Sequence, residues 1–206
     1  MTGVSAALPA VVRAYDAVAP DYDGLLVPAA PERERLWQRF AVLFPPGSRV
    51  LDVTAGTGLD AIHLHERGVQ VTACDLSAGM LAQLQLKAPA IPVRRADLNR
   101  LEESGIAGPF DGLISTFAGV NTAFDLTGLA RAAGRLVRPG GVVVLHVLRR
   151  GRAFWRRTRT VTISGTPVPH RLWSGRELCR LFAPAFARSR SASSETFLTL
   201  ELVRHG

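Results

Sequence analysis

The sequence predicts a doubly wound α/β fold: a seven-stranded, mostly parallel sheet with helices on both faces and an antiparallel C-terminal hairpin. Strand-like and helix-like segments alternate from residue 49 onward, with short turns between them. The segment 142–148 is a nearly unbroken apolar run, as is typical of a parallel strand covered on both faces. In such sheets, ligands bind at the carboxyl ends of the strands, near the switch in strand order.

Two helices are expected before the sheet begins. Residues 9–23 predict a short helix and a polar turn, and residues 31–43 predict a helix with Leu36, Phe40 and Leu43 on one face. The expected core strands are 49–53, 69–74, 91–95, 112–117 and 142–148, and the helices between them are 58–66, 77–87 and 125–137. The tail adds strands 160–163 and 197–203, with a helix 174–182 between them.

Length and composition predict a single soluble domain in the cytoplasm. The 206 residues suffice for one hydrophobic core. No apolar run is long enough to span a bilayer, and the N-terminus lacks the basic region and cleavage site of a signal peptide. The two cysteines, Cys74 and Cys179, predict neither a disulfide framework nor a metal site.

The net charge of +8 is concentrated in one segment. Lys87 is the only lysine, and six arginines stand between residues 149 and 159, where there is no acidic residue. Removing those six from +8 leaves +2, an ordinary balance for an enzyme. The overall charge therefore does not indicate nucleic-acid binding by itself.

The turn after the first expected strand, residues 50–58 (VLDVTAGTG), carries the most chemical information. Gly56 and Gly58 let the backbone turn tightly and approach a ligand, and the helix that follows directs free N–H groups into the same space. Asp52 closes the first strand. Asp75 closes the second, where it can accept both hydroxyls of a ribose, and Asp97 follows the third, within reach of an adenine amine.

This layout suits two classes of cofactor, which the glycine spacing alone does not separate. Residues 56–61 also fit the GxGxxA pattern of dinucleotide-binding proteins. The acids favour S-adenosylmethionine, because Asp52 and Asp60 would repel a pyrophosphate and attract a sulfonium with its α-amino group. The alternative for Asp52 is a capping role.

In their order and spacing, the motifs resemble those of the class I S-adenosylmethionine-dependent methyltransferases, in the small-molecule branch related to ubiquinone biosynthesis. Residues 15–23 resemble the Tyr-Asp segment that closes over the cofactor in this family. Five further segments resemble the successive core motifs of the family: 50–58, 71–81, 94–101, 110–121 and 135–145. Residues 170–186 resemble the helix that precedes the family's antiparallel hairpin. The chain is then one domain, with a helical lid (1–45), a cofactor-binding core (46–150), and a substrate-side insertion with C-terminal strands (151–206).

One residue departs from the family pattern. Thr54 stands where the first motif usually has a glycine. Three explanations are open: the turn starts one residue later, the side chain narrows the methionine pocket, or the chain binds the cofactor poorly. The remaining motifs favour an active enzyme.

The resemblance also implies which residues bind S-adenosylmethionine and its product, S-adenosylhomocysteine. Tyr15 and Tyr22 are expected to pack on the sulfonium by cation–π attraction, with anchoring of the N-terminal helix as the alternative. The other implied contacts are Asp52, Ala55, Gly56 and Gly58 at the methionine half, Asp75 at the ribose, Leu76, Met80, Asp97 and Leu98 at the adenine, and Phe117 and Ala118 under the sulfur.

Methyl transfer from a sulfonium is an in-line displacement, so the protein mainly aligns the reactants and excludes water. A general base is needed only if the acceptor must lose a proton. Three candidate catalytic residues are expected near the pocket: His146 near the carboxyl end of the fifth strand, His170 in the segment before the helix 174–182, and Asn121 after the fourth strand. A structural role is the alternative for both histidines.

The acceptor is expected to be a small molecule, with its methylated atom left open. The segment 149–159 includes Phe154 and Trp155, and it is either a solvated basic loop, a clamp for an anionic acceptor or a site for RNA. The competing functions are an RNA or protein methyltransferase, a non-catalytic S-adenosylmethionine-binding protein and a dinucleotide oxidoreductase. RNA is disfavoured for want of an added RNA-binding domain. A monomer or homodimer without metal or membrane attachment is expected.

Overall fold

The computed structural model describes residues 3–25, 29–150, 157–163 and 165–206. Seven strands form one sheet in the order β3-β2-β1-β4-β5-β9-β8, and β6 pairs with β7 in a separate two-stranded sheet. The first five strands of that order run parallel to one another, and β9 runs antiparallel to both of its neighbours, β5 and β8. The predicted α/β fold, with its mostly parallel seven-stranded sheet and antiparallel C-terminal hairpin, is confirmed.

The strands are β1 (Arg49–Asp52), β2 (Gln70–Asp75), β3 (Val93–Arg95), β4 (Phe110–Ser115), β5 (Val137–Leu148), β6 (Thr158–Ile163), β7 (Thr166–Arg171), β8 (Phe186–Ser193) and β9 (Phe197–Arg204). The α-helices are α1 (Gly3–Val18), α2 (Tyr22–Leu25), α3 (Ala30–Leu43), α4 (Leu59–Glu66), α5 (Ala78–Lys87), α6 (Thr127–Leu136) and α7 (Gly175–Phe182). Short 3-10 helices are η1 (Ala19–Asp21), η3 (Leu98–Ser104) and η4 (Gly119–Thr122).

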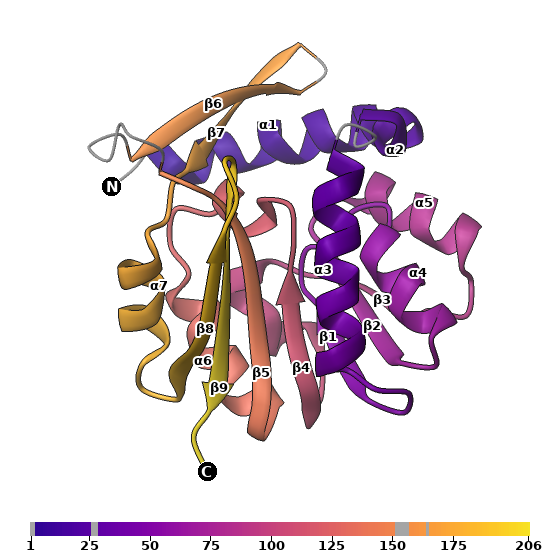
Figure 1. Cartoon of the computed structure of the whole chain (residues 1–206). Coiled ribbons are helices and arrows are strands. Elements are labelled where there is room, and N and C mark those ends of the chain that lie inside the picture. The colour runs from indigo at the N-terminus through magenta and orange to yellow at the C-terminus, as the bar shows by residue number, and fades with distance from the viewer. Residues whose placement is uncertain (1–2, 26–28, 151–156, 164) are drawn as a thin grey trace.

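Helices cover both faces of the sheet, and an apolar core lies against each face (Figure 1). On one face, α3, α4 and α5 bury side chains such as Phe40, Leu64 and Leu84. On the other, α6 and α7 bury side chains such as Leu129 and Phe182. This two-sided burial explains why the central strands read as continuous apolar runs.

The strand order reverses between β1 and β4, which opens a crevice at the carboxyl ends of the strands. In Figure 1, α1 and the β6–β7 hairpin lie across this end of the sheet, at the top of the view. Contacts of α1 with both α5 and β7 hold it there. The fold therefore places a roof over the edge at which a ligand is expected.

The strand that completes the sheet is not the one that the sequence predicted. β8 takes the seventh place, and the expected strand 160–163 belongs to the separate β6–β7 hairpin. Neither β7 nor β8 carries an apolar pattern: β7 contains Pro167 and Pro169, and all but the first residue of β8 are exposed. An edge strand buries little surface, so its sequence shows little periodicity.

Two further boundaries differ. The helix expected at 9–23 begins at Gly3 and ends at Val18, followed by η1 and α2. β5 begins at Val137, earlier than the expected 142, because it pairs with Phe110 before a register shift. The division of the chain into lid, core and C-terminal part stays a prediction.

No described helix has the length and apolar character needed to cross a membrane. The same described residues hold no group of three or more His, Cys, Asp or Glu side chains arranged for a metal ion. Cys74 and Cys179 are free thiols.

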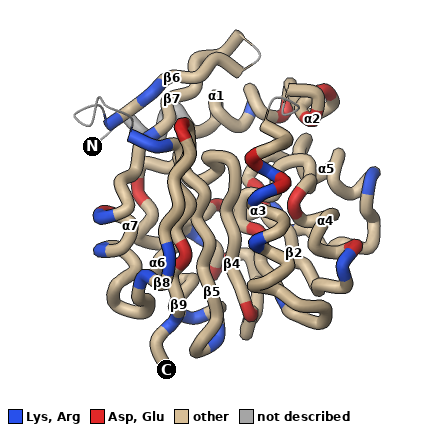
Figure 2. The backbone as a smooth tube through the Cα atoms, in the orientation of Figure 1, with Lys and Arg blue, Asp and Glu red and all other residues tan. Residues whose placement is uncertain are grey.

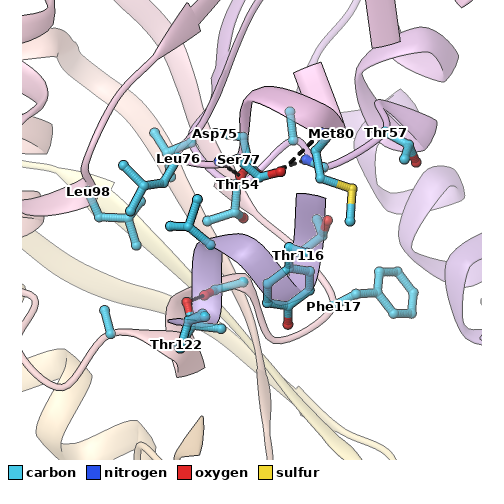
Figure 3. Close-up of a pocket in the computed structure, with 18 of the residues that line it drawn as sticks. Thr54, Thr57, Asp75, Leu76, Ser77, Met80, Leu98, Thr116, Phe117 and Thr122 are labelled. Atoms are coloured by element: carbon cyan, nitrogen blue, oxygen red, sulfur yellow. Dashed lines mark hydrogen bonds between the residues drawn. The ribbon is translucent and has the colours of Figure 1, made fainter. Parts of the chain in front are cut away.

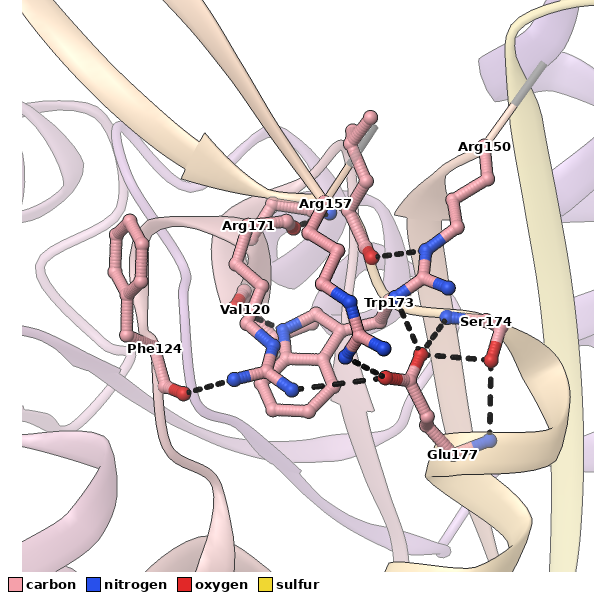
Figure 4. A network of polar contacts seen from close by, with 10 residues as sticks. Val120, Phe124, Arg150, Arg157, Arg171, Trp173, Ser174 and Glu177 are labelled. Carbon is pink, nitrogen blue, oxygen red and sulfur yellow. Dashed lines mark hydrogen bonds and ion pairs between the residues drawn. The ribbon is translucent and has the colours of Figure 1, made fainter. Parts of the chain in front are cut away.

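Glu177, in the first turn of α7, is the hub of a polar network that anchors the hairpin (Figure 4). It forms a capping box with Ser174, whose Oγ and backbone N–H donate to Glu177 Oε2 at 2.7 and 2.9 Å. Arg150 contacts the same oxygen at 2.7 Å, and Arg157 and Arg171 reach Oε1 at 3.6 Å. One carboxylate thus joins the end of β5 and both ends of the hairpin to α7.

We expect Glu177→Ala to lower the free energy of unfolding by about 2 kcal/mol or more, because three guanidinium groups lose their shared carboxylate. Ser174→Ala removes only the cap and is expected to cost about 1 kcal/mol. Denaturant unfolding of both variants measures the difference. Equal losses would show that the arginines add nothing.

The Glu177 network should also make the stability of the fold depend on pH. Burial alone would raise the pKa of Glu177, but the hydrogen bonds from Ser174 and the Arg150 ion pair outweigh it and hold that pKa below its usual value. The stabilisation is therefore present at neutral pH and lost as the pH falls through the lowered pKa.

Candidate cofactor-binding site

The turn after β1 brings the backbone close to the crevice. Gly56 and Gly58 have φ angles of 54° and 91°, in the left-handed region that favours glycine. A Cβ on Gly58 would lie 2.2 Å from Leu84 Cδ1, so this glycine lets α4 start directly against α5. The N-terminal N–H groups of α4 consequently face the carboxyl ends of the strands.

Asp75, at the end of β2, joins this turn to the next one. Its Oδ2 accepts the Gly56 N–H at 2.9 Å, and its Oδ1 accepts the Ser77 N–H at 2.9 Å. Burial raises the pKa of Asp75 and these backbone hydrogen bonds oppose the rise. A carboxylate has about four acceptor positions, so Asp75 keeps capacity for a ligand's hydroxyl groups.

A cavity opens at this edge of the sheet (Figure 3). Apolar side chains line it on the side of α5 and η3, including Leu76, Met80 and Leu98. Thr116 and Phe117, at the end of β4, lie on the opposite side.

The N-terminal segment is fastened over the cavity at both ends of α5. Asp16 Oδ1 accepts from the Ser77 hydroxyl at 2.5 Å and from the Gly79 N–H at 2.8 Å, at the start of α5. Asp23 pairs with Lys87 at 2.7 Å, at the end of α5, and also accepts from the Thr57 hydroxyl. The two Tyr-Asp dipeptides of this segment thus supply its attachment through their aspartates.

Tyr15 and Tyr22 place two aromatic rings on the cavity wall. Their ring centroids are 6.1 Å apart in an edge-to-face arrangement. Burial, together with Asp75, raises the pKa of both phenols, so they stay protonated at neutral pH. Neutral aromatic rings of this kind attract cations through their faces.

The region around the β1 turn is acidic. Asp52 is almost completely buried, its Oδ1 accepts the Thr54 N–H at 3.2 Å, and its Oδ2 has no hydrogen-bond partner among the described residues. Burial and then the neighbouring Asp60 raise the pKa of Asp52 well above its usual value, and Asp75 adds to the rise. A cationic ligand at this position would relieve that repulsion.

Asp60, at the start of α4, holds the one basic side chain found on the cavity wall of the described structure. Arg33 Nη1 lies 2.6 Å from Asp60 Oδ1, and Trp37 Nε1 and Thr116 Oγ1 donate to the same carboxylate at 2.7 and 2.5 Å. The Arg33 guanidinium also lies 3.9 Å from the centroid of the Phe117 ring. The cation is therefore fixed on two sides.

The sequence reasoning missed Arg33, although a signal was present. Arg33 precedes Leu36 by three residues and Phe40 by seven, so it falls on the apolar face of α3 and is itself buried. An arginine on a buried helix face needs a partner.

Most of the residues expected to bind the cofactor do line the cavity. They are Tyr15, Tyr22, Ala55, Gly56, Asp75, Leu76, Met80, Asp97, Leu98 and Phe117. Three do not: Asp52 lies beneath the turn, Gly58 packs against Leu84, and Ala118 packs with Leu148 on the far side of the β4 end.

None of the three candidate catalytic residues lines the cavity. His146 is buried under Phe117 and Phe197, with Nδ1 3.1 Å from Thr199 Oγ1, and burial lowers its pKa to about 4. His170 is buried in β7, with Nδ1 3.1 Å from a backbone carbonyl. Asn121 donates to the Arg171 carbonyl at 2.6 Å and accepts from the Leu148 N–H at 3.0 Å. These contacts favour structural roles, and catalysis by these residues stays a prediction.

The described part of the basic segment also lies outside the cavity. Arg149 donates to the Ser194 carbonyl, Arg150 and Arg157 contact Glu177, and Arg159 is exposed on β6 (Figure 2). The remaining members of this segment, Arg152, Phe154, Trp155 and Arg156, lie outside the described residues.

Comparison with known proteins agrees with this geometry. Residues 50–141, which include the β1 turn and Asp75, match a family described as a methyltransferase domain. Over these residues the chain is similar to methyltransferase domains. The chain is also similar to curated methyltransferases. The demethylmenaquinone methyltransferase of Beutenbergia cavernae is 35% identical to it over 134 residues, and that of Mycolicibacterium paratuberculosis is 32% identical over 138 residues. These alignments cover 64% and 66% of this chain but only 55% and 58% of the relatives.

Solved methyltransferases share the fold at low sequence identity. A S-adenosylmethionine-dependent methyltransferase from Mesorhizobium loti superposes with a TM-score of 0.64 at 20% identity, covering 82% of this chain and 97% of that one. The glycopeptide N-methyltransferase MtfA, crystallised with S-adenosylmethionine, gives a TM-score of 0.65 at 18% identity, covering 82% and 92%.

We expect Asp60→Ala to lower the free energy of unfolding by roughly 3–5 kcal/mol, because it leaves the buried Arg33 guanidinium without a counter-charge. Chemical denaturation measures the loss. Glu103→Ala is the matched control, since its pair with Arg100 is more than 60% exposed on both sides and is worth about 0–1 kcal/mol. Similar losses in the two variants would contradict the assignment.

We expect His146 to make the protein less stable in mild acid. Its pKa in the folded state is lowered by burial to about 4 from 6.5, so below about pH 6.5 the unfolded state takes up a proton that the folded state refuses. Stability should fall on the order of 1–3 kcal/mol as the pH drops toward 4. His146→Gln should flatten that slope in denaturant titrations, and an unchanged slope would mean that His146 is accessible and charged.

Proposed function

We propose that this chain transfers a methyl group from S-adenosylmethionine to a small-molecule acceptor. The observation that carries the proposal is the cavity at the carboxyl ends of β1, β2 and β4, where Asp75 stands beside an apolar recess and below two tyrosine rings. The surplus of carboxylates there favours a sulfonium and an ammonium group over a pyrophosphate. The methyltransferase relatives support the same reading.

The residues on the cavity wall fit each part of this cofactor. Asp75 would accept the two ribose hydroxyls, and Leu76, Met80 and Leu98 would pack against the adenine. The β1 turn would hold the methionine half, with the Asp52 carboxylate beneath it. When bound, S-adenosylmethionine supplies a methyl group on a positively charged sulfur.

Arg33 is the one basic side chain on the described cavity wall. Its guanidinium is held by Asp60 at 2.6 Å and by the Phe117 ring at 3.9 Å, so its position is set before a ligand arrives. A guanidinium held in this way suits a carboxylate or an ionised oxygen. We propose that it orients an anionic group at the methionine end of the cavity, from the cofactor's carboxylate or the acceptor.

The acceptor is proposed to be a small, largely apolar molecule. Leu8, Val11 and Val12 of α1 line the cavity away from the β1 turn. The relatives are named for demethylmenaquinone, a small quinone-type acceptor, although this chain spans little more than half of their length. Since no histidine of the described residues lines the cavity, an acceptor that ionises easily fits best.

The placement of the basic segment weighs against the RNA or protein alternative. Arg150 and Arg157, two of its described arginines, share the Glu177 carboxylate, and side chains of α1 line the cavity. We therefore keep a free metabolite as the substrate. The cytoplasmic location and the monomeric or homodimeric state stay predictions.

The reaction can be tested by incubating the protein with S-adenosylmethionine and a panel of reduced quinone and phenol acceptors, and by measuring released S-adenosylhomocysteine. We expect release that depends on the acceptor. Binding of S-adenosylmethionine without release with any acceptor would favour the non-catalytic alternative, and release only with RNA or protein would replace the small molecule.

We expect Asp75→Ala to weaken S-adenosylhomocysteine binding by tenfold or more, because two hydrogen bonds to a carboxylate, each worth about 1.5–3 kcal/mol, are lost. Isothermal titration calorimetry measures the affinity. Asp111→Ala is the control, because Asp111 lies at the start of β4, at the opposite edge of the sheet. Unchanged affinity in Asp75→Ala would mean that the cofactor lies elsewhere.

A further inference from the structure

Thr54, the residue that departs from the family pattern, lies on the cavity wall just after β1 (Figure 3). Its Oγ1 is 2.7 Å from the Oγ of Ser115, a fully buried residue at the end of β4. A β-branched side chain has few rotamers, so this hydrogen bond leaves Thr54 little freedom to move. Thr54 therefore acts as a rigid part of the cavity.

Gly119 lies directly against this side chain. A Cβ on Gly119 would be 2.2 Å from Thr54 Oγ1, 2.4 Å from its Cβ and 2.7 Å from its Cγ2. These atoms belong to the stiff base of a side chain and not to a flexible end. Gly119 is not among the glycines with positive φ, so it is required here for space and not for backbone conformation.

The turn that carries Gly119 cannot easily move away. Phe117 and Ala118 have φ angles of 44° and 67°, which residues with side chains rarely adopt. The Gly119 N–H donates to the Thr116 carbonyl at 3.0 Å, and the Ala118 N–H donates to the His146 carbonyl at 3.1 Å. A side chain at position 119 would consequently displace Thr54 or the turn itself, and both line the cavity.

We propose that Thr54 and Gly119 form a matched pair that sets the floor of the cofactor cavity, so that the ligand affinity of this site depends on their fit. Thr54 fills volume that the glycine usual in the family would leave open, and Gly119 supplies the space that makes this possible. The proposal rests on the proposed function for the identity of the ligand. Of the three explanations for Thr54, the proposal adopts the one in which its side chain narrows the methionine pocket of an intact site.

A double-mutant cycle on S-adenosylhomocysteine binding tests the pair. We expect Gly119→Ala to weaken the affinity by roughly tenfold or more, because the Thr54 side chain or the turn that it displaces lines the cavity, when calorimetry is done well below the unfolding temperature. In the Thr54→Gly background, we expect the same substitution to cost less than about threefold, because the colliding atoms are gone. Ligand affinity in folded protein is a readout that a purely structural role would not move.

Gly112→Ala is the matched control. Its Cβ would lie 2.2 Å from Phe44 Cε1, the same clearance as at Gly119, but on the side of β4 that faces α3 and outside the cavity. We expect it to lower the unfolding temperature without weakening ligand binding, and Thr54→Gly should not rescue it. An equal loss of affinity in Gly112→Ala would overturn the proposal.

Equal costs of Gly119→Ala in both backgrounds, or normal binding by Gly119→Ala alone, would also overturn it. If Gly119→Ala does not fold, the double variant is compared with Thr54→Gly. Ligand binding by the double variant then supports the matched pair, and loss of binding in the double variant alone refutes it. If the wild-type chain does not bind S-adenosylhomocysteine, the proposed function fails by itself. The pair is then tested by the same cycle on unfolding free energies, where additivity would refute it.

Discussion

The carboxylate of Asp75 accepts the N–H groups of Gly56 and Ser77, and through them it joins the turn after β1 to the turn after β2. Both turns lead into helices, so this one group aligns the starts of α4 and α5 beside the same cavity. The Ser77 hydroxyl in turn donates to Asp16 of the N-terminal segment, which fixes the roof. The floor, walls and roof of the site thus depend on a buried acid that also lines the cavity.

Charge decides which ligand such a site can hold. Negative charge is costly near the β1 turn, where Asp52, Asp60 and Asp75 lie close together. The raised pKa of Asp52 indicates this cost, since burial raises that pKa most and its acidic neighbours raise it further. Arg33 is the local exception, and Asp60 compensates it. A ligand that carries positive charge at sulfur and nitrogen and one carboxylate matches this distribution, whereas a dinucleotide's pyrophosphate does not. The charges around the cavity therefore complement those of the proposed cofactor.

Much of this arrangement could be predicted from the sequence because it depends on local chemistry. Apolar runs marked the buried parallel strands, and the acids that close β1 and β2 stood beside the glycine turn. What the sequence could not indicate depends on partners distant along the chain. β8 is an exposed edge strand without periodicity, and His146 was expected near the ligand but lies behind Phe117, because a strand position does not tell which face its side chain takes. The fit of Thr54 against Gly119 joins residues that follow different strands and needs coordinates to be seen.

The identity of the cofactor underlies every role assigned to the cavity, and one comparison addresses it directly. Isothermal titration of the wild-type chain with S-adenosylmethionine and, separately, with NAD measures which of the two cofactors consistent with the glycine turn is bound. The acidic cavity and Asp75 predict saturable, one-to-one binding of S-adenosylmethionine and no binding of NAD at the same concentrations. Tight binding of NAD without binding of S-adenosylmethionine would contradict the assignment of this site.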